Sequence, residues 1–183
     1  MIRSKAHDEF LALYKPVHER FVRYCSSHAY GIIETEDLVQ ETLLKTMQHF
    51  SSLKDKEKLL PFMFSIANNV MHNILRRKKF KGAYDEKAFS KLSALTGNAE
   101  TAMDIHYLYQ ALNQLHEKDK EAIILFEITG YSIKEIASIQ NSNENATKTR
   151  LSRARQKLKT LLEEHPHSKI NYARVEQLFS FLI

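Results

Sequence analysis

The stretch Gly130–Lys159, GYSIKEIASIQNSNENATKTRLSRARQKLK, decides the fold of the second half of the chain. Gly130 ends one helix, and Ser132–Glu135 has the pattern of a capping box, in which a serine and a glutamate side chain each bond to a backbone N–H at a helix start. The sequence predicts a helix of barely two turns, a turn at Asn141–Asn143 with Asn143 as a candidate N-cap, and a long helix to about Glu164. This layout is that of a helix-turn-helix.

The long helix of this stretch is basic, because no acidic residue lies between Glu144 and Glu163. Its predicted buried stripe is Leu151, Ala154, Leu158 and Leu161. Its cations are Lys148, Arg150, Arg153, Arg155, Lys157 and Lys159. The DNA major groove is about 12 Å wide and has phosphate walls, so it suits a helix with one apolar side and cations elsewhere. The alternative is a solvated basic face on a bundle helix; the capped short helix just before it favours DNA binding.

Helical patterns also fill the first half of the chain. Apolar residues recur at three- and four-residue steps from Asp8 to His28, and Pro16 predicts a kink or a break. Thr35 is a candidate N-cap for the next helix. The inward face of that helix is predicted at Val39, Leu43, Met47 and Phe50. A polar loop at 51–58 then precedes a strongly apolar helix, Phe62–Leu75, which runs into basic residues and stops at Gly82.

These patterns predict an all-α protein with two small helical domains joined by a linker, the C-terminal one a helix-turn-helix. The expected boundaries are 1–82 for the N-terminal domain, 83–103 for the linker, 104–164 for the C-terminal domain and 165–183 for a helical tail of unknown role. The linker is expected to hold one short helix, around Lys87–Leu95. Hydrophobic residues make up 43% of the chain, whereas there are only four glycines and three prolines, which disfavours a many-turned β protein.

Charge and cysteine content narrow the class of protein. The net charge of +5 allows a polyanionic partner without proving one. Cys25 is the single cysteine, so no intramolecular disulfide forms, which fits a reducing compartment, and we expect it to be a small core residue. The N-terminus lacks the apolar run of a signal peptide, and no segment has the roughly 20 apolar residues of a membrane span. We therefore expect a cytoplasmic protein without membrane insertion.

Three motifs now carry a resemblance to a known family. Tyr131–Ala137 followed by Lys148–Leu158 resembles the C-terminal domain of RNA polymerase sigma factors, Glu36–Leu44 is similar to their core-binding helix, and Phe62–Asn69 running into Arg76–Lys79 resembles their promoter-melting segment. The resemblance covers roughly residues 8–164. Two domains with the motifs in this order are typical of the extracytoplasmic-function (ECF) type in the sigma-70 superfamily.

The resemblance implies a transcription initiation factor that binds core RNA polymerase and directs it to specific promoters. It implies contacts with the beta-prime clamp and the beta flap of the polymerase and with promoter DNA, and it raises an anti-sigma factor as a further partner. The free protein is expected to be a monomer. No catalytic site, metal or cofactor is implied, and the sequence itself lacks a glycine-rich phosphate loop and a zinc ligand set around His165 and His167.

The family's functional positions carry over residue by residue. Core polymerase binding falls on Asp37, Gln40 and Glu41. Minus-ten DNA binding falls on Lys45, Phe64, Asn69, Arg76, Arg77, Lys78 and Lys79, with an unstacked base held between the loop at 51–58 and the following helix. Minus-thirty-five DNA binding falls on Lys148, Thr149, Arg150, Ser152, Arg153 and Lys157.

The chain departs from the family's pattern at several places that bear on promoter preference. Phe62, expected to be a core residue, stands where the family usually has tryptophan, and Asn73 stands where it often has aspartate. The turn at 141–145 is more polar than usual, and Glu144 opposes phosphate. Two rival hypotheses remain: a helix-turn-helix regulator that acts without being a polymerase subunit, and a helical interaction protein that binds no DNA.

Overall fold

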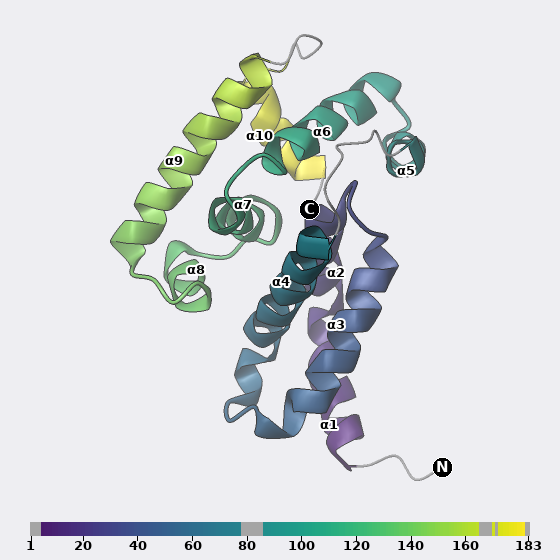
Figure 1. The fold of residues 1–183 in the computed structure, drawn as a ribbon, viewed down its shortest axis with the longest axis vertical. Helices are drawn as coiled ribbons and strands as arrows, with labels where there is room; N and C mark the ends of the chain where they lie inside the picture. The colour runs from purple at the N-terminus through teal and green to yellow at the C-terminus, as the bar shows by residue number, and fades with distance from the viewer. Residues whose placement is uncertain (1–4, 78–85, 165–169, 171, 182–183) are drawn as a thin grey trace. The chain divides into compact units, whose positions relative to one another are not determined.

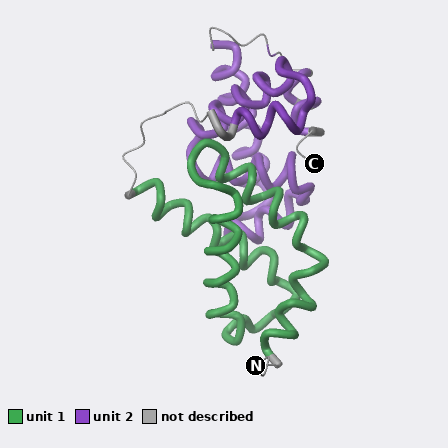
Figure 2. The backbone as a smooth tube through the Cα atoms, turned by 90° about the vertical axis from the view of Figure 1, so that its right-hand side faces the viewer, with its two compact units in different colours: residues 1–82 green, residues 83–183 purple. Residues whose placement is uncertain are grey.

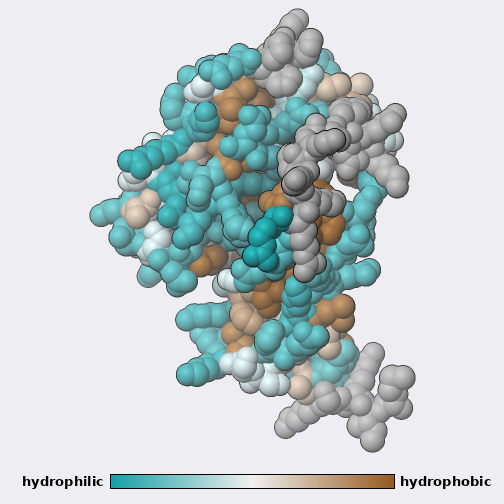
Figure 3. Space-filling model, in the orientation of Figure 1, coloured by the Kyte–Doolittle hydropathy of each residue, from teal (hydrophilic) through white to brown (hydrophobic). Residues whose placement is uncertain are grey.

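The computed structural model describes residues 5–77, 86–164, 170 and 172–181. The chain divides into two compact units, 1–82 and 83–183, which Figure 2 distinguishes by colour. All regular structure among the described residues is helical, which confirms the all-α prediction. None of the helices in this part of the chain has both the length and the apolar content required to cross a membrane. Hydrophilic residues cover most of the face in Figure 3.

In the first unit, the described residues 5–77 form four α-helices, which Figure 1 labels. They are α1 (Lys5–Tyr14), α2 (His18–Ala29), α3 (Thr35–His49) and α4 (Leu59–Arg77). Pro16 lies in a 3-10 turn, η1 (Lys15–Val17), that separates α1 from α2, as its missing N–H predicts. Two further 3-10 turns, η2 (Phe50–Ser52) and η3 (Lys56–Lys58), occupy the predicted polar loop between α3 and α4.

Aromatic side chains form the centre of the first unit. Phe21, Tyr24 and Phe64 are fully buried, and the ring centroids of Tyr24 and Phe64 lie 4.2 Å apart. Such pairs stabilise a core beyond the area that they bury. Cys25 lies buried beside them, as predicted, and this burial raises the pKa of its thiol well above the usual range.

The buried face of α3 differs from the predicted one by a rotation of about one residue. Leu38, Thr42 and Thr46 are fully buried or nearly so. The predicted inward residues Val39 and Leu43 are only half-buried, and Met47 is 37% exposed. Thr46 can lie inside because its hydroxyl donates to the Thr42 carbonyl at 2.7 Å, a local bond that removes most of the cost of burying it. A search for apolar spacing alone cannot find this face.

Thr35 is the first residue of α3 rather than its N-cap. Glu34 has the extended backbone conformation of the N-cap position, and its side chain accepts no bond from the first turn. The negative charges of Glu36 and Asp37 in that turn favour the helix dipole instead.

In the described part of the second unit there are six α-helices, labelled in Figure 1, and one π-helical turn. The helices are α5 (Glu86–Thr96), α6 (Ala99–Leu112), α7 (Glu117–Ile123), α8 (Ile133–Ile139), α9 (Glu144–Glu163) and α10 (Tyr172–Phe181). The π-helical turn η4 (Ile124–Ile128) continues α7. Leu108, Leu112, Ile123 and Leu125 are fully buried and make up the centre of this core.

Part of the predicted linker at 83–103 is ordered as helix. Residues 86–96 form α5, which packs against α6, and α6 already begins at Ala99. Leu92 is buried, and the Phe89 ring meets His106 edge-on with centroids 5.7 Å apart. The Asn98 side chain caps α6 by accepting from Glu100 N at 2.9 Å. The helix α5 is the short one expected around Lys87–Leu95, and it extends one residue further at each end.

The tail helix predicted beyond Pro166 is present as α10. It packs against α6 and η4, and Val175, Leu178 and Phe179 are buried. Arg174 Nε lies 3.2 Å from Asp104 Oδ2 on α6, and this ion pair helps to hold the tail helix beside α6.

Candidate functional site

The helix-turn-helix begins with the predicted capping box. Ser132 N donates to Glu135 Oε2 at 2.8 Å, and Glu135 N donates to Ser132 Oγ at 3.3 Å, so α8 starts at a fixed point. Gly130, which ends the preceding helix, has φ = +71°, a conformation that residues with a Cβ rarely adopt. These two local features set the direction in which the chain enters the motif.

Two asparagines in the polar turn between α8 and α9 have structural roles. Asn141 has φ = +48°, in the left-handed region that asparagine tolerates better than most residues. Asn143 is the N-cap of α9, as predicted, because its Oδ1 accepts from Ala146 N at 2.8 Å. The departure from the family's usual turn therefore leaves the geometry of the motif intact.

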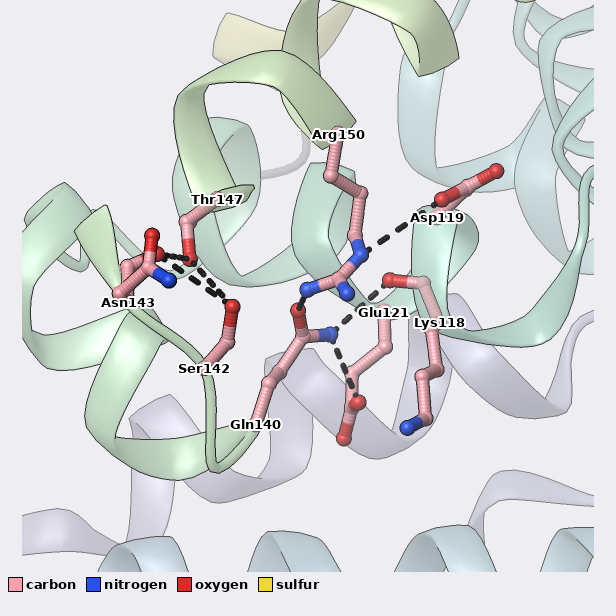
Figure 4. Close-up of polar contacts among 8 residues, drawn as sticks. All are labelled: Lys118, Asp119, Glu121, Gln140, Ser142, Asn143, Thr147 and Arg150. Atoms are coloured by element: carbon pink, nitrogen blue, oxygen red, sulfur yellow. Dashed lines mark hydrogen bonds and ion pairs between the residues drawn. The ribbon is translucent and has the colours of Figure 1, made fainter. Parts of the chain in front are cut away.

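A buried amide joins the three helices of the motif (Figure 4). Gln140, at the end of α8, is only 9% exposed. Its Nε2 donates to the Lys118 carbonyl and to Glu121 Oε2, both at 2.9 Å and both on α7. Its Oε1 accepts from Arg150 Nη1 of α9 at 2.6 Å. One side chain thus holds α8, α7 and α9 in register.

Arg150 does not lie where a DNA-contacting residue is expected. Besides Gln140, its guanidinium faces Asp119, with Nε 3.8 Å from Oδ1, and 21% of the side chain is exposed. Arg150 is thus tied to neighbouring helices of the unit, and its assignment to the minus-thirty-five surface stays a prediction. Arg155 is held in a similar way, by two bonds to Glu127 Oε1 at 2.7 and 2.9 Å and by the Phe126 ring.

The other predicted DNA-contacting residues of α9 all face solvent. They are Lys148, Thr149, Ser152, Arg153 and Lys157. Leu151, Ala154 and Leu158 are buried as predicted, but the stripe ends at Leu162 rather than at Leu161, which is half-buried. A straight helix of 3.6 residues per turn reaches the same side after four residues here, not three.

A pocket of about 320 Å³ opens in the first unit between α3, η2 and α4. It is lined by Lys45, His49, Ser52, Phe62, Ile66 and Asn69. The loop beside it is tied down by Lys56, whose Nζ donates to the Phe50 carbonyl and lies 3.7 Å from the centre of the Phe50 ring. The pocket thus combines one aromatic wall, one aliphatic wall and several polar side chains.

The pocket brings together two of the predicted residues, Lys45 and Asn69, with Ser52 from the predicted loop. Phe64 is not among them, because it is completely buried against Phe21 and Tyr24. Its assignment to DNA binding was therefore wrong, and so was the core assignment of Phe62, which is the aromatic residue that lines the pocket.

His49 was missed by the sequence reasoning, although one signal pointed to it. It follows Lys45 by one helical turn, so the two residues share a face of α3.

The basic run Arg76–Lys79 begins in the last turn of α4, and the structure describes only part of it. Arg76 is exposed, and its Nη2 donates to Asn73 Oδ1 at 3.3 Å. Arg77 is the last residue of α4. Lys78 and Lys79, both predicted to contact DNA, lie outside the described residues.

The exposed face of α3 mixes acidic, amide and apolar side chains. Asp37, Gln40 and Glu41 are exposed, as predicted for a docking surface. Leu44, on the same helix, is 63% exposed, and the sequence reasoning did not single it out. Glu41 also pairs with Lys45 at 2.9 Å, and Lys45 lines the pocket, so this face of α3 adjoins the rim of the pocket.

Metal-ligating residues do not gather anywhere in the described ranges: no group of three His, Cys, Asp or Glu side chains lies close enough to hold an ion. His165 and His167 fall outside those ranges.

Each of the two units resembles a known protein family in sequence. Residues 13–81 match the family Sigma-70 region 2, and residues 105–158 match the family Sigma-70, region 4. The chain is 30% identical over 128 residues to the ECF RNA polymerase sigma factor SigM of Bacillus subtilis, which covers 69% of this chain and 78% of SigM. It is 27% identical over 164 residues to the RNA polymerase sigma factor CarQ of Myxococcus xanthus, covering 88% of this chain and 94% of CarQ.

A solved structure shares the fold. The sigma factor RpoE from Bartonella quintana, crystallised in complex with the anti-sigma factor NepR, superposes with a TM-score of 0.59 at 24% identity, and the match covers 85% of this chain and 99% of RpoE. A helix-turn-helix regulator that acts without polymerase is not favoured, because it has no reason to carry a region 2 unit. With both sigma-70 regions matched in order and a SigM relative covered over most of its length, the chain belongs to the ECF RNA polymerase sigma factors, the promoter-directing initiation subunits of the sigma-70 superfamily.

Proposed function

We propose that the pocket of the first unit receives one unpaired base of the minus-ten element. The observation that carries this proposal is the pocket itself, in which the aromatic wall of Phe62 lies among the polar groups of Lys45 and Asn69. Stacking of a base on an aromatic ring is worth about 1–3 kcal/mol, and cations such as Arg76 and Arg77 hold the neighbouring phosphates. Lys78 and Lys79 extend the same basic run along the sequence.

The exposed face of α3 is the surface proposed to dock on the beta-prime clamp of core polymerase. Asp37, Gln40 and Glu41 supply polar groups that set register and partner choice, and the exposed Leu44 supplies apolar area. Gln40→Ala combined with Glu41→Lys should therefore weaken core binding. The fold of the first unit should be kept, because both side chains are outside its core.

The second unit is proposed to bind the minus-thirty-five element with α9 in the major groove, and to contact the beta flap. Lys148, Arg153 and Lys157 are suited to phosphates, while Thr149 and Ser152 lie between them. Arg153→Glu should reduce use of the upstream element and leave core binding unchanged. Phosphate contacts should also make promoter binding fall steeply as salt is raised.

The mode of action follows from these surfaces. The protein acts by recruitment as a monomeric, cytoplasmic subunit and catalyses no reaction itself. The RpoE structure was obtained with an anti-sigma factor, and we expect a comparable inhibitor for this chain.

Transcription in vitro tests the pocket. Core polymerase with the full chain, or with Phe62→Ala or Asn69→Ala, is given a library of templates with randomised promoters and a matched template with a pre-opened bubble. Loss of the pocket should lower run-off product from duplex templates about tenfold. Product from the bubble template should fall less, because the strands there are already separated.

Ser65→Ala is the matched control, since Ser65 is exposed on α4 outside the pocket. Equal activity of Phe62→Ala, Asn69→Ala and Ser65→Ala on duplex templates would remove the pocket from promoter opening. Absence of run-off product with the unaltered chain on every template would contradict the proposed function as a whole.

A further inference from the structure

The rotation of α9 about its own axis is fixed by groups on its inner side. Leu151, Ala154 and Leu158 lie in the core, and Arg150 and Arg155 are bound to Gln140 and Glu127 at the two borders of that buried stripe. Because apolar packing and ion pairs agree on this orientation, the residues on the opposite side of α9 must point away from the unit.

The outward line of α9 is polar and uncharged. Its four members are Asn145, Thr149, Ser152 and Gln156, and all four are exposed. They are spaced at steps of four, three and four, so they form one continuous row along the helix. Among the described residues, no side chain bonds to the amide of Asn145 or of Gln156: the contacts made at these residues, Thr149 Oγ1 to the Asn145 carbonyl and Thr160 Oγ1 to the Gln156 carbonyl, use their backbones.

Cations flank this row on both sides. Lys148 and Lys159 lie along one edge, and Arg153 and Lys157 lie along the other. A groove has phosphates on its two walls and base edges on its floor, so a row of neutral hydrogen-bonding groups between two lines of cations matches its cross-section. The row from Asn145 to Gln156 is about 16 Å long, or about three turns of the helix.

We propose that Asn145 and Gln156 are specificity-determining residues that read base edges near the two ends of the upstream element. This inference rests on the proposed role of α9 in the major groove. Asparagine and glutamine side chains offer a donor and an acceptor to N7 and N6 of adenine, which makes adenine the base class that each amide selects. Thr149 and Ser152 occupy the positions between them.

Selection from random DNA by the holoenzyme tests this assignment. Core polymerase carrying the full chain is incubated with promoter fragments whose upstream element is randomised, and bound fragments are sequenced. Asn145→Ala and Gln156→Ala should each lose, by about tenfold or more, the preference for adenine at one position, and the two positions should differ. Lys157→Ala is the matched control, because loss of a phosphate contact weakens all sequences alike.

A chemical substitution then isolates the contact. Replacing the selected adenine by 7-deazaadenine removes only the N7 acceptor, so it should weaken binding of the unaltered holoenzyme and have no further effect on the matching alanine variant. An unchanged base preference in either alanine variant overturns the assignment of that amide. Failure of the unaltered holoenzyme to enrich any upstream sequence contradicts the proposed function instead, and so the two failures are distinguishable.

Discussion

Six cations on α9 look alike in the sequence, but the structure gives them two kinds of task. Arg150 and Arg155 end on Gln140 and Glu127, whereas Lys148, Arg153, Lys157 and Lys159 are exposed, with Lys159 lying 3.8 Å from Glu163. The distinction depends on acidic and amide partners that lie 10 and 28 residues away in the chain. Arginine suits such ties because its planar group donates several bonds at once.

Removing the Arg150 tie should destabilise the second unit. Arg150→Met keeps much of the aliphatic stem but leaves the buried Gln140 Oε1 without its donor, which should lower the free energy of unfolding by about 1–3 kcal/mol. Urea denaturation followed by circular dichroism measures the change. Arg153→Met is the control, because this exposed residue should alter stability by about 0.5 kcal/mol at most. Equal losses in the two variants would show that the tie is not a stabilising one.

A buried lysine makes the stability of the second unit depend on pH. Burial lowers the pKa of Lys120 from 10.5 to about 8, against the opposing charge of Glu117, and its Nζ donates to Asn113 Oδ1 at 2.6 Å. Between pH 8 and 10.5 the unfolded chain binds a proton at Lys120 that the folded chain has released. Raising the pH through this window therefore favours the folded state through Lys120.

The substitution Lys120→Met isolates this contribution. The difference in free energy of unfolding, unaltered chain minus Lys120→Met, should become more positive as the pH rises from 7 to 10. Denaturation at several pH values, with other titrating groups common to both proteins, gives the difference directly. Parallel pH profiles would show that Lys120 binds its proton equally in the folded and unfolded chain.

Individual site residues were only partly predictable from the sequence. Lys45 and Asn69 were correctly expected to share one pocket, because the family's motif fixes their places on two neighbouring helices. Phe62 and Phe64 were exchanged, since residues two apart on a helix face nearly opposite sides and both are aromatic. Only the packing of Phe64 against Tyr24 decides which ring is internal.

At the scale of the element, α8 is a seven-residue helix that its own sequence scarcely supports. Isolated helices of that length are unstable in water, so its position depends on the cap at Ser132 and on Gln140 at its other end. The capping box was predictable because it is local in sequence. The Gln140 bonds were not, since their partners on α7 lie about 20 residues away.

Removal of the cap should be measurable without touching the DNA-facing surface. Ser132→Ala should cost about 0.5–2 kcal/mol of stability, because the Glu135 N–H loses its acceptor. Ser138→Ala, exposed within the same helix, is the matched control and should be close to neutral. Thermal unfolding by calorimetry compares them, and a Ser132 variant as stable as the Ser138 variant would deny the cap a role.

The existence of α3 was predictable, but its rotation was not. Apolar spacing placed Val39, Leu43 and Met47 inside, whereas the helix buries Leu38, Thr42 and Thr46. Threonine carries a methyl group as well as a hydroxyl, and at Thr46 a bond to its own helix lets the side chain pack like valine. The rotation leaves apolar area from Leu44 on the outside, where a partner is expected to cover it.

For the whole molecule, the pattern of two helical clusters was visible in the sequence because each has its own apolar periodicity. A short helix between them was expected around Lys87–Leu95, although little more than Leu92 is buried among its described side chains and Leu95 is 84% exposed. Its packing on α6 is a tertiary preference that no local pattern announces.

The tail should stabilise one unit only. A chain that stops after Glu164 lacks α10 and so loses the burial of Val175, Leu178 and Phe179, each worth about 1.5–3 kcal/mol when fully buried. Hydrogen exchange measured by mass spectrometry should become faster in α6 and η4, which α10 contacts, and remain unchanged in α2, α3 and α4. Leu178→Ala should give a smaller change of the same kind. Unaltered exchange in α6 would mean that the tail adds no stability.

The division of α9 into an inner and an outer side has an evolutionary consequence. Substitutions on the outer row leave the core and its ties intact, and exposed changes typically shift stability by no more than about 0.5 kcal/mol. A duplicated gene can therefore drift toward a new set of target operons through a handful of codon changes while its product still folds. Adaptation of such a regulator to new genes is therefore limited by which promoter sequences are not already used by related regulators, rather than by the effect of the substitutions on folding.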